Sequence, residues 1–220
     1  MLLLFSILLA MANSKVINIH VKVGKTLENM ADEYNTGMRN IDKTLRINFK
    51  TNHQPHITLY MTDFKDDKIP DMIQKIKQTV STMKKGKISQ ANGYREGTYV
   101  MWNTSIEKYI KQLSNTIVDS TYQFAKPNQP VPGWIKDLPD PEQRRRKTEY
   151  VQKYGSPNVY EEFEPHISLG CDTDKEALEK GFQGIHVQEA EFESFAIALG
   201  TAGECGTVMR GLDMGYFYLK

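Results

Sequence analysis

A five-residue motif occurs twice in this chain, once in each half. Residues 55–59 read Pro-His-Ile-Thr-Leu, and residues 165–169 read Pro-His-Ile-Ser-Leu. Both copies are β-branched and aliphatic and begin at a proline, as strands often do. The repeat therefore predicts two similar strands, brought together by a fold with approximate two-fold symmetry.

Side chains alternate between the two faces of a strand. In the first copy, His56 and Thr58 are expected on one face, and Ile57, Leu59 and Met61 on the other. The aliphatic face would be buried, which leaves an imidazole and a hydroxyl on the opposite face.

The second copy predicts the same arrangement, with His166 and Ser168 opposite Ile167, Leu169 and Cys171. Two imidazoles and two hydroxyls in one pocket suit phosphoryl chemistry without a metal. One neutral histidine accepts a proton from the nucleophile, and one protonated histidine donates a proton to the leaving oxygen. The hydroxyls hold non-bridging phosphate oxygens. A single His-x-Thr is usually only the wet face of a strand, and short repeats can be purely structural, but the doubled motif favours a site.

Composition limits the classes of partner. The chain has 220 residues, 40% of them hydrophobic, which is enough for one core or for two lobes that share a core. Its formal net charge is only +1, so we expect no binding of duplex DNA. A nucleotide or a short oligonucleotide needs only a local positive site. We expect a monomer without a cofactor and without a membrane span.

The first residues form an apolar leader. Residues 1–10 are almost wholly apolar, and Ala10-Met11-Ala12 is a small-x-small sequence of the kind that signal peptidase cleaves. Residues 1–12 are therefore interpreted as a signal peptide, which predicts a secreted protein. The leader is short and lacks a basic residue before its apolar run; a buried first strand, or a start at Met11 in a cytoplasmic protein, is the alternative.

Two cysteines are present, Cys171 and Cys205. They can pair in an oxidising compartment, where a bridge would brace the second motif strand. Two free buried thiols fit the sequence equally well. Asn103-Thr104-Ser105 is a sequon for glycosylation.

Hydrophobic periodicity predicts the order of the other elements. Helices are expected over residues 27–41, 69–83 and 106–122, the last with a capping box of Thr104 and Glu107, and a short helix after a cap at Asp172 or Thr173. Strands are expected over residues 16–23, 87–94, 98–102, 191–199 and 207–219. The glycine-rich residues 200–206 precede no helix and are interpreted as a hairpin loop. The class is α+β, with antiparallel sheets in two lobes.

Residues 126–160 differ from the rest of the chain. Five prolines lie between Lys126 and Pro141, with Trp134 among them, which indicates a lid or a substrate-specific insertion. A helix over residues 142–154 would carry Arg144, Arg145, Arg146 and Lys147. We interpret this basic cluster as a solvated face, with guidance of an RNA end as the alternative.

The paired motifs, the order of elements and the chain length resemble the 2H phosphoesterase superfamily. Its signature of two His-x-(Thr or Ser)-x motifs is matched by His56-Ile57-Thr58-Leu59 and His166-Ile167-Ser168-Leu169, and the resemblance covers most of residues 16–220. It implies one bilobal domain over residues 13–220, with two antiparallel sheets flanked by helices and an active site in the central groove.

The resemblance also implies an activity. This is metal-independent hydrolysis of phosphodiesters that involve a ribose 2′ oxygen: a 2′,3′-cyclic phosphate, a 2′,5′-linked oligonucleotide or a cyclic dinucleotide. His56 and His166 would be acid and base, in an order that the sequence leaves open, and Thr58 and Ser168 would bind the phosphate. Several relatives carry an arginine shortly after the second motif, where this chain has Gly170-Cys171-Asp172.

Three further interpretations stay open. Trp134, Tyr94 or Tyr160 would stack a base, although each also fits ordinary packing. A nucleotide-binding module with the same fold and no turnover is the alternative function. A metallohydrolase has only His53-x-x-His56 in its favour, without a carboxylate cluster, and a serine hydrolase lacks its Gly-x-Ser-x-Gly turn.

Overall fold

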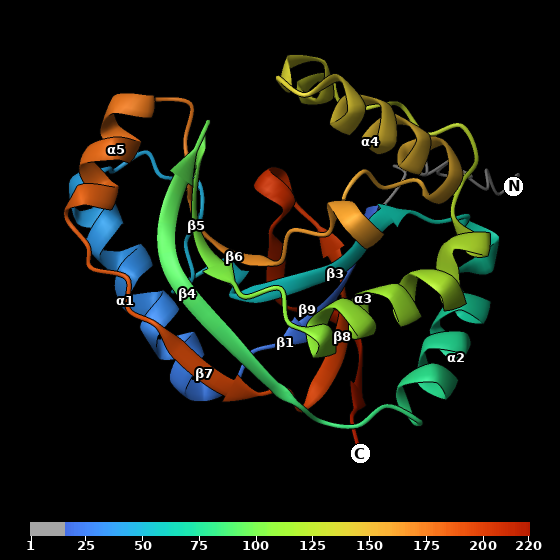
Figure 1. The fold of residues 1–220 in the computed structure, drawn as a ribbon. Coiled ribbons are helices and arrows are strands. Elements are labelled where there is room, and N and C mark those ends of the chain that lie inside the picture. The colour runs from blue at the N-terminus through green and yellow to red at the C-terminus, as the bar shows by residue number, and fades with distance from the viewer. Residues whose placement is uncertain (1–15) are drawn as a thin grey trace, which may run out of the picture.

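A computed structural model describes residues 16–220 of the chain. The predicted signal peptide at residues 1–12 lies outside the described residues. Two curled antiparallel sheets and five α-helices make up the described part, which is the predicted α+β, two-lobed architecture (Figure 1).

The first sheet has five strands in the order β2-β9-β8-β1-β3. Their bounds are His53–Gln54 (β2), Val208–Tyr218 (β9), Ala196–Ala202 (β8), Val16–Lys22 (β1) and His56–Asp63 (β3). Alternate residues of β1, Ile17, Ile19 and Val21, are buried in the hydrophobic core. The motif strand β3 forms one edge of this sheet, paired antiparallel with β1.

The second sheet has four strands in the order β6-β5-β4-β7. Their bounds are His166–Cys171 (β6), Tyr99–Thr104 (β5), Lys87–Glu96 (β4) and Ala190–Glu193 (β7). The motif strand β6 again forms an edge, paired antiparallel with β5. Gly97, at φ +58° in the β4–β5 turn, adopts a left-handed conformation that favours glycine.

The helices cover the sheets in a crossed arrangement. Their bounds are Lys25–Ile41 (α1), Ile69–Val80 (α2), Lys108–Thr121 (α3), Pro141–Tyr154 (α4) and Lys175–Gln183 (α5). The amphipathic helix α1 follows β1 of the first sheet but packs with α5 on the second, burying Leu27, Ala31 and Met38 (Figure 1). Conversely, α3 follows β5 of the second sheet but packs with α2 on the first. This exchange unites the two lobes.

The predicted strand over residues 191–199 is wrong as a single element. It is divided into β7 of the second sheet and β8 of the first. Between them, the backbone N–H of the buried Ser194 donates to the Gly86 carbonyl, at 2.9 Å, so the chain leaves one ladder there and enters the other.

Two predicted helix caps are also wrong. Thr104 belongs to β5, and its buried hydroxyl exchanges hydrogen bonds with the side-chain amide of the cross-strand residue Gln90. Helix α3 therefore begins after Glu107 without a side-chain cap. The cap of α5 is Asp174, whose carboxylate accepts from the N–H groups of Glu176 and Ala177. Helix α2 ends at Val80, before the predicted Met83.

The insertion folds into a short 3₁₀ turn at Gly133–Asp137 followed by α4, which lies at the top of the view in Figure 1. Its basic cluster is only partly a solvated face. Arg145 is exposed, but Lys147 is buried, and its ammonium reaches Asn158 at 2.8 Å and both Glu162 and Glu164 at 3.4 Å. Burial of the Lys147 charge is stabilised by these carboxylates, which are far along the chain and invisible to a local pattern.

Candidate functional site

The two motif strands meet where the sheets approach each other. Strands β3 and β6 are each the edge strand of their own sheet, and they contact one another. The sequence repeat therefore becomes a spatial pair, with one copy on each side of the junction between the two lobes.

Each motif strand carries a β-bulge at the same position. Along β3, Thr58 pairs with His20 and Tyr60 with Ile19, so Leu59 is an additional residue. Along β6, Ser168 pairs with Met101 and Gly170 with Val100, so Leu169 is additional. A bulge reverses the alternation of side chains beyond it, and bulges are frequent next to active sites.

The bulges correct two predicted orientations. Met61 does not share a face with Ile57: its sulfur lies 3.7 Å from the Asn18 amide nitrogen, which also contacts Thr58. By the same reversal, Cys171 turns to the face of His166 and Ser168, where it is disulfide-bonded to Cys205.

His56 is fixed by its own strand and by β1. Its Nδ1 lies 3.0 Å from the Gln54 carbonyl oxygen, and its Nε2 lies 3.3 Å from the Asn18 amide nitrogen. The ring also packs edge-on against that of His20, with 5.1 Å between ring centroids. Burial lowers the pKa of His56 to about 4; hydrogen bonding to the backbone of Gln54 and Gly206 opposes this shift, and the His166 charge adds to it.

His166 is held in the same way at the other edge. Its Nδ1 lies 2.9 Å from the Glu164 carbonyl oxygen. Burial lowers the pKa of His166, and the opposing influences are the Glu164 backbone and the carboxylates of Glu164 and Glu96. The two histidines differ in their surroundings, because two carboxylates act on His166, whereas the Asp213 carboxylate and the His166 charge act in opposite directions on His56.

The sequence interpretation did not single out the polar residues beneath His56. Asn18 and His20 of β1 are fully buried, and the half-buried Asp213 of β9 has its carboxylate 3.8 Å from His20 Nε2. Gln54 links the Asp213 carboxylate, at 2.7 Å, to the Lys22 ammonium, at 2.6 Å. The signal is present in the sequence, since residues 18, 20 and 22 are polar and alternate with aliphatic residues along one strand.

The disulfide connects the two halves of the site. Cys171 ends the motif strand β6 of the second sheet, and Cys205 lies in the turn between β8 and β9 of the first. The next residue in that turn, Gly206, hydrogen-bonds His56 through its backbone. Of the two states that the sequence left open, the structure contains the paired one.

The three predicted stacking residues lie in different surroundings. Tyr94 is cross-strand from Met101, which pairs with Ser168, so it lies two strands from the second motif. Trp134 is 46% exposed, with the Lys147 ammonium 5.7 Å from its ring centroid. Tyr160 packs on Tyr154, 4.9 Å between centroids, and its hydroxyl donates to Asp119.

A metal cluster is not formed around His53. Its Nδ1 accepts from the Asn48 N–H at 3.0 Å, and between residues 16 and 220 no three His, Cys, Asp or Glu side chains come together as a metal site would require. Within the same residues, no helix is long and apolar enough to cross a membrane.

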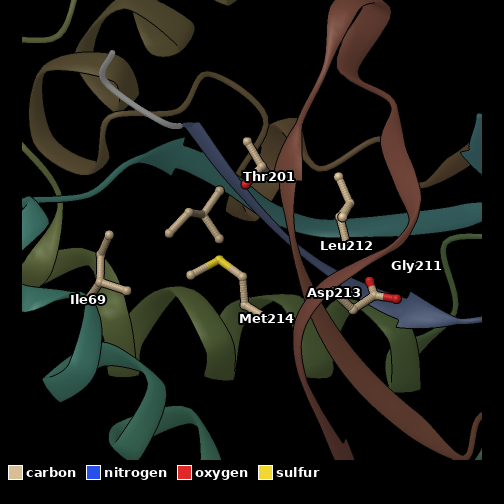
Figure 2. Close-up of a pocket in the computed structure, with 7 residues that line it drawn as sticks. Ile69, Thr201, Gly211, Leu212, Asp213 and Met214 are labelled. Atoms are coloured by element: carbon tan, nitrogen blue, oxygen red, sulfur yellow. The ribbon is translucent and has the colours of Figure 1, made fainter. Parts of the chain in front are cut away.

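A separate pocket of about 460 Å³ lies beside the first sheet (Figure 2). Ile69 of α2 and Leu212 and Met214 of β9 line it, and none of the four motif residues does. It therefore does not contain the motif residues, although Asp213 of the polar group beneath His56 also lines it.

No protein-family model matches the chain, and no curated protein matches it. Solved structures share its fold. TT0787 of Thermus thermophilus superposes with a TM-score of 0.56 at 13% identity, over 93% of this chain and 97% of that chain. E. coli LigT complexed with 3′-AMP gives 0.56 at 10% identity, over 94% and 98%. A protein described as a phosphoesterase gives 0.51 at 9% identity, over 94% and 99%. The chain thus has the bilobal fold that its resemblance to the 2H phosphoesterases predicts.

Proposed function

We propose that this chain is a metal-independent phosphodiesterase that cleaves nucleotide phosphodiesters involving a ribose 2′ oxygen. One observation carries the proposal: two matching His-x-(Thr or Ser) edge strands meet with the same bulge and the same histidine contact. In each, Nδ1 is engaged by the carbonyl two residues earlier, which directs Nε2 away from that carbonyl.

In hydrolysis by two such histidines, one accepts a proton and the other donates one. One Nε2 removes a proton from the attacking water as its oxygen bonds to phosphorus. The other Nε2–H delivers a proton to the ribose oxygen as its bond to phosphorus breaks. The hydroxyls of Thr58 and Ser168 are the proposed donors to the non-bridging oxygens, where negative charge accumulates.

A nucleotide substrate is supported by structures with the same fold. E. coli LigT has been crystallised with 3′-AMP and, at a TM-score of 0.50, with NADP+. For this chain we propose Tyr94 as the first candidate to stack a base, because its strand position places it on the face of Met101 and Ser168. The rings of Trp134 and Tyr160 already contact Lys147 and Tyr154.

The test is a turnover screen in EDTA. The substrates are 2′,3′-cyclic nucleotides, 2′,5′-linked oligoadenylate, 3′,5′-linked RNA and cyclic dinucleotides, each with wild type and with His56→Ala. We expect cleavage of at least one 2′-linked substrate by wild type alone. Tight binding of one ligand without cleavage of any would overturn the proposal in favour of a nucleotide-binding module, and activity that requires a metal would replace the mechanism.

We further propose export through the apolar leader. The Cys171–Cys205 disulfide supports this location, because disulfides persist in oxidising compartments. Expression of the full chain in a secreting host, followed by intact mass, tests it: the expected product begins after Ala12. A full-length product retained in the cytoplasm would contradict export.

A further inference from the structure

Asn18 and His20 of β1 lie beneath the first motif, and of these two side chains only Asn18 contacts it through hydrogen bonds. The Asn18 amide nitrogen lies 2.9 Å from Thr58 Oγ1 and 3.3 Å from His56 Nε2. It therefore reaches both residues of the first His-x-Thr at once. Asn18 is fully buried, which removes water as a competing partner.

The polarity of the contact with His56 follows from the tautomer of the ring. Since the Gln54 carbonyl accepts from Nδ1–H, the neutral ring has its lone pair on Nε2. In this tautomer the Asn18 N–H faces that lone pair at 3.3 Å, and a proton on Nε2 would displace it. Hydrogen bonding to the neutral form disfavours the charged form.

The same amide has an uncompensated oxygen. Among the residues that the structure describes, Asn18 Oδ1 is buried and has no hydrogen-bond partner. A buried polar atom left in this state destabilises the folded protein. The position thus retains an amide at a cost to stability, which is typical of functional sites.

We propose that Asn18 is a positioning residue of this site, which holds His56 in the neutral, proton-accepting form and orients the Thr58 hydroxyl. This inference rests on the proposed function and deepens it. In the step that begins from the free protein, the O–H of the nucleophile takes the place of the Asn18 N–H at the Nε2 lone pair, His56 accepts its proton there, and His166 is the donor. The acidic surroundings of His166, from Glu164 and Glu96, suit that assignment.

Other groups face His56 and act alongside Asn18. The His20 ring and the His166 charge disfavour a second positive charge there, whereas the Asp213 carboxylate and the Gly206 backbone favour it. Lys22 lies on the neighbouring strand, paired with His56 in register. Among these groups, Asn18 can be converted from a donor to an acceptor by one isosteric substitution, Asn18→Asp.

The test is Asn18→Asp, with the titration of His56 followed by NMR and its signals assigned by their loss in His56→Ala. A carboxylate in place of the amide favours the imidazolium, so the pKa of His56 is expected to rise by about one unit or more. Asn103→Asp is the matched control, because Asn103 is cross-strand from His166 instead. This control should leave the pKa of His56 unchanged.

If Asn18→Asp fails to fold, Asn18→Ala replaces it in the test. A smaller rise in the pKa of His56 is then expected, because only the donor is lost. The acid limb of kcat/KM should move to higher pH together with the NMR titration. An unchanged His56 titration in a folded Asn18 variant overturns the inference. Because the NMR measurement needs no turnover, it stands even if no substrate is cleaved, which would instead contradict the proposed function.

Discussion

His56 and His166 are anchored to their own strands by the same contact. The Nδ1 atom of His56 lies 3.0 Å from the Gln54 carbonyl oxygen, and that of His166 lies 2.9 Å from the Glu164 carbonyl oxygen. Each histidine thus uses the backbone two residues earlier to fix its tautomer and ring orientation. The local repeat of the sequence becomes two imidazoles that are anchored in the same way and belong to different sheets.

The hydroxyls should matter less than the histidines. Thr58→Val and Ser168→Ala each remove one donor to the phosphate, which costs on the order of a hundredfold to a thousandfold in kcat. His56→Ala should cost more, since it removes both proton transfer and an aromatic contact of the site. Steady-state kinetics in EDTA gives the comparison. Larger losses at the hydroxyls than at the histidines would point to a different division of labour.

The pH dependence of kcat/KM should be bell-shaped and displaced to acid. His56, as the base, must be neutral, so activity falls as pH drops through its pKa of about 4. His166, as the acid, must be protonated, so activity falls as pH rises through a pKa below the ordinary value of 6.5. Initial rates at low substrate concentration across this range test it. A flat profile, or an optimum on the alkaline side of 6.5, would contradict the acid–base pair.

Reduction of the disulfide should destabilise the protein and loosen the site. Cys171 and Cys205 are 34 residues apart, and the chain-entropy model gives a contribution of about 3–4 kcal/mol for a loop of that size. Urea unfolding of wild type with and without reductant, beside the double variant Cys171→Ser/Cys205→Ser, measures it. The double variant must be insensitive to reductant. Equal stability of oxidised and reduced wild type would refute this role.

Lys147 should anchor the insertion to the second motif. Its ammonium contacts Glu162 and Glu164, and Glu164 supplies the carbonyl that holds His166. Removing one partner of a buried ion pair costs about 3–5 kcal/mol, so Lys147→Ala should be strongly destabilising. Arg145→Ala, on an exposed position of the same helix, is the control and should leave the urea midpoint unchanged. Similar midpoints for the two variants would contradict the anchoring role.

Local patterns predicted the elements that local forces determine. The helix over residues 27–41 and the strands at both motifs have strong periodicity, and they form as expected. The division of residues 191–199 depends on a hydrogen bond from Ser194 to Gly86, far away along the chain. The sequence around residues 191–199 does not indicate such a distant partner.

Prediction of the site from local sequence patterns has the same limit. The doubled motif indicated its four residues, but the bulges at Leu59 and Leu169 arise from pairing with β1 and β5, so Met61 and Cys171 were assigned to the wrong face. The function of Asn18 was equally hidden. Its alternation with aliphatic residues was visible, whereas its contact with His56 appears only when β1 and β3 pair.

The central claim is that His56 and His166 act as one catalytic unit, and a double-mutant cycle tests it most directly. Single-turnover rates in EDTA would be measured for wild type, His56→Ala, His166→Ala and the combined variant on the best substrate of the screen. Residues that act as a unit are strongly non-additive, so each single variant should lose nearly as much as the double variant. Losses that simply multiply, or one histidine that can be removed without loss, would contradict the account.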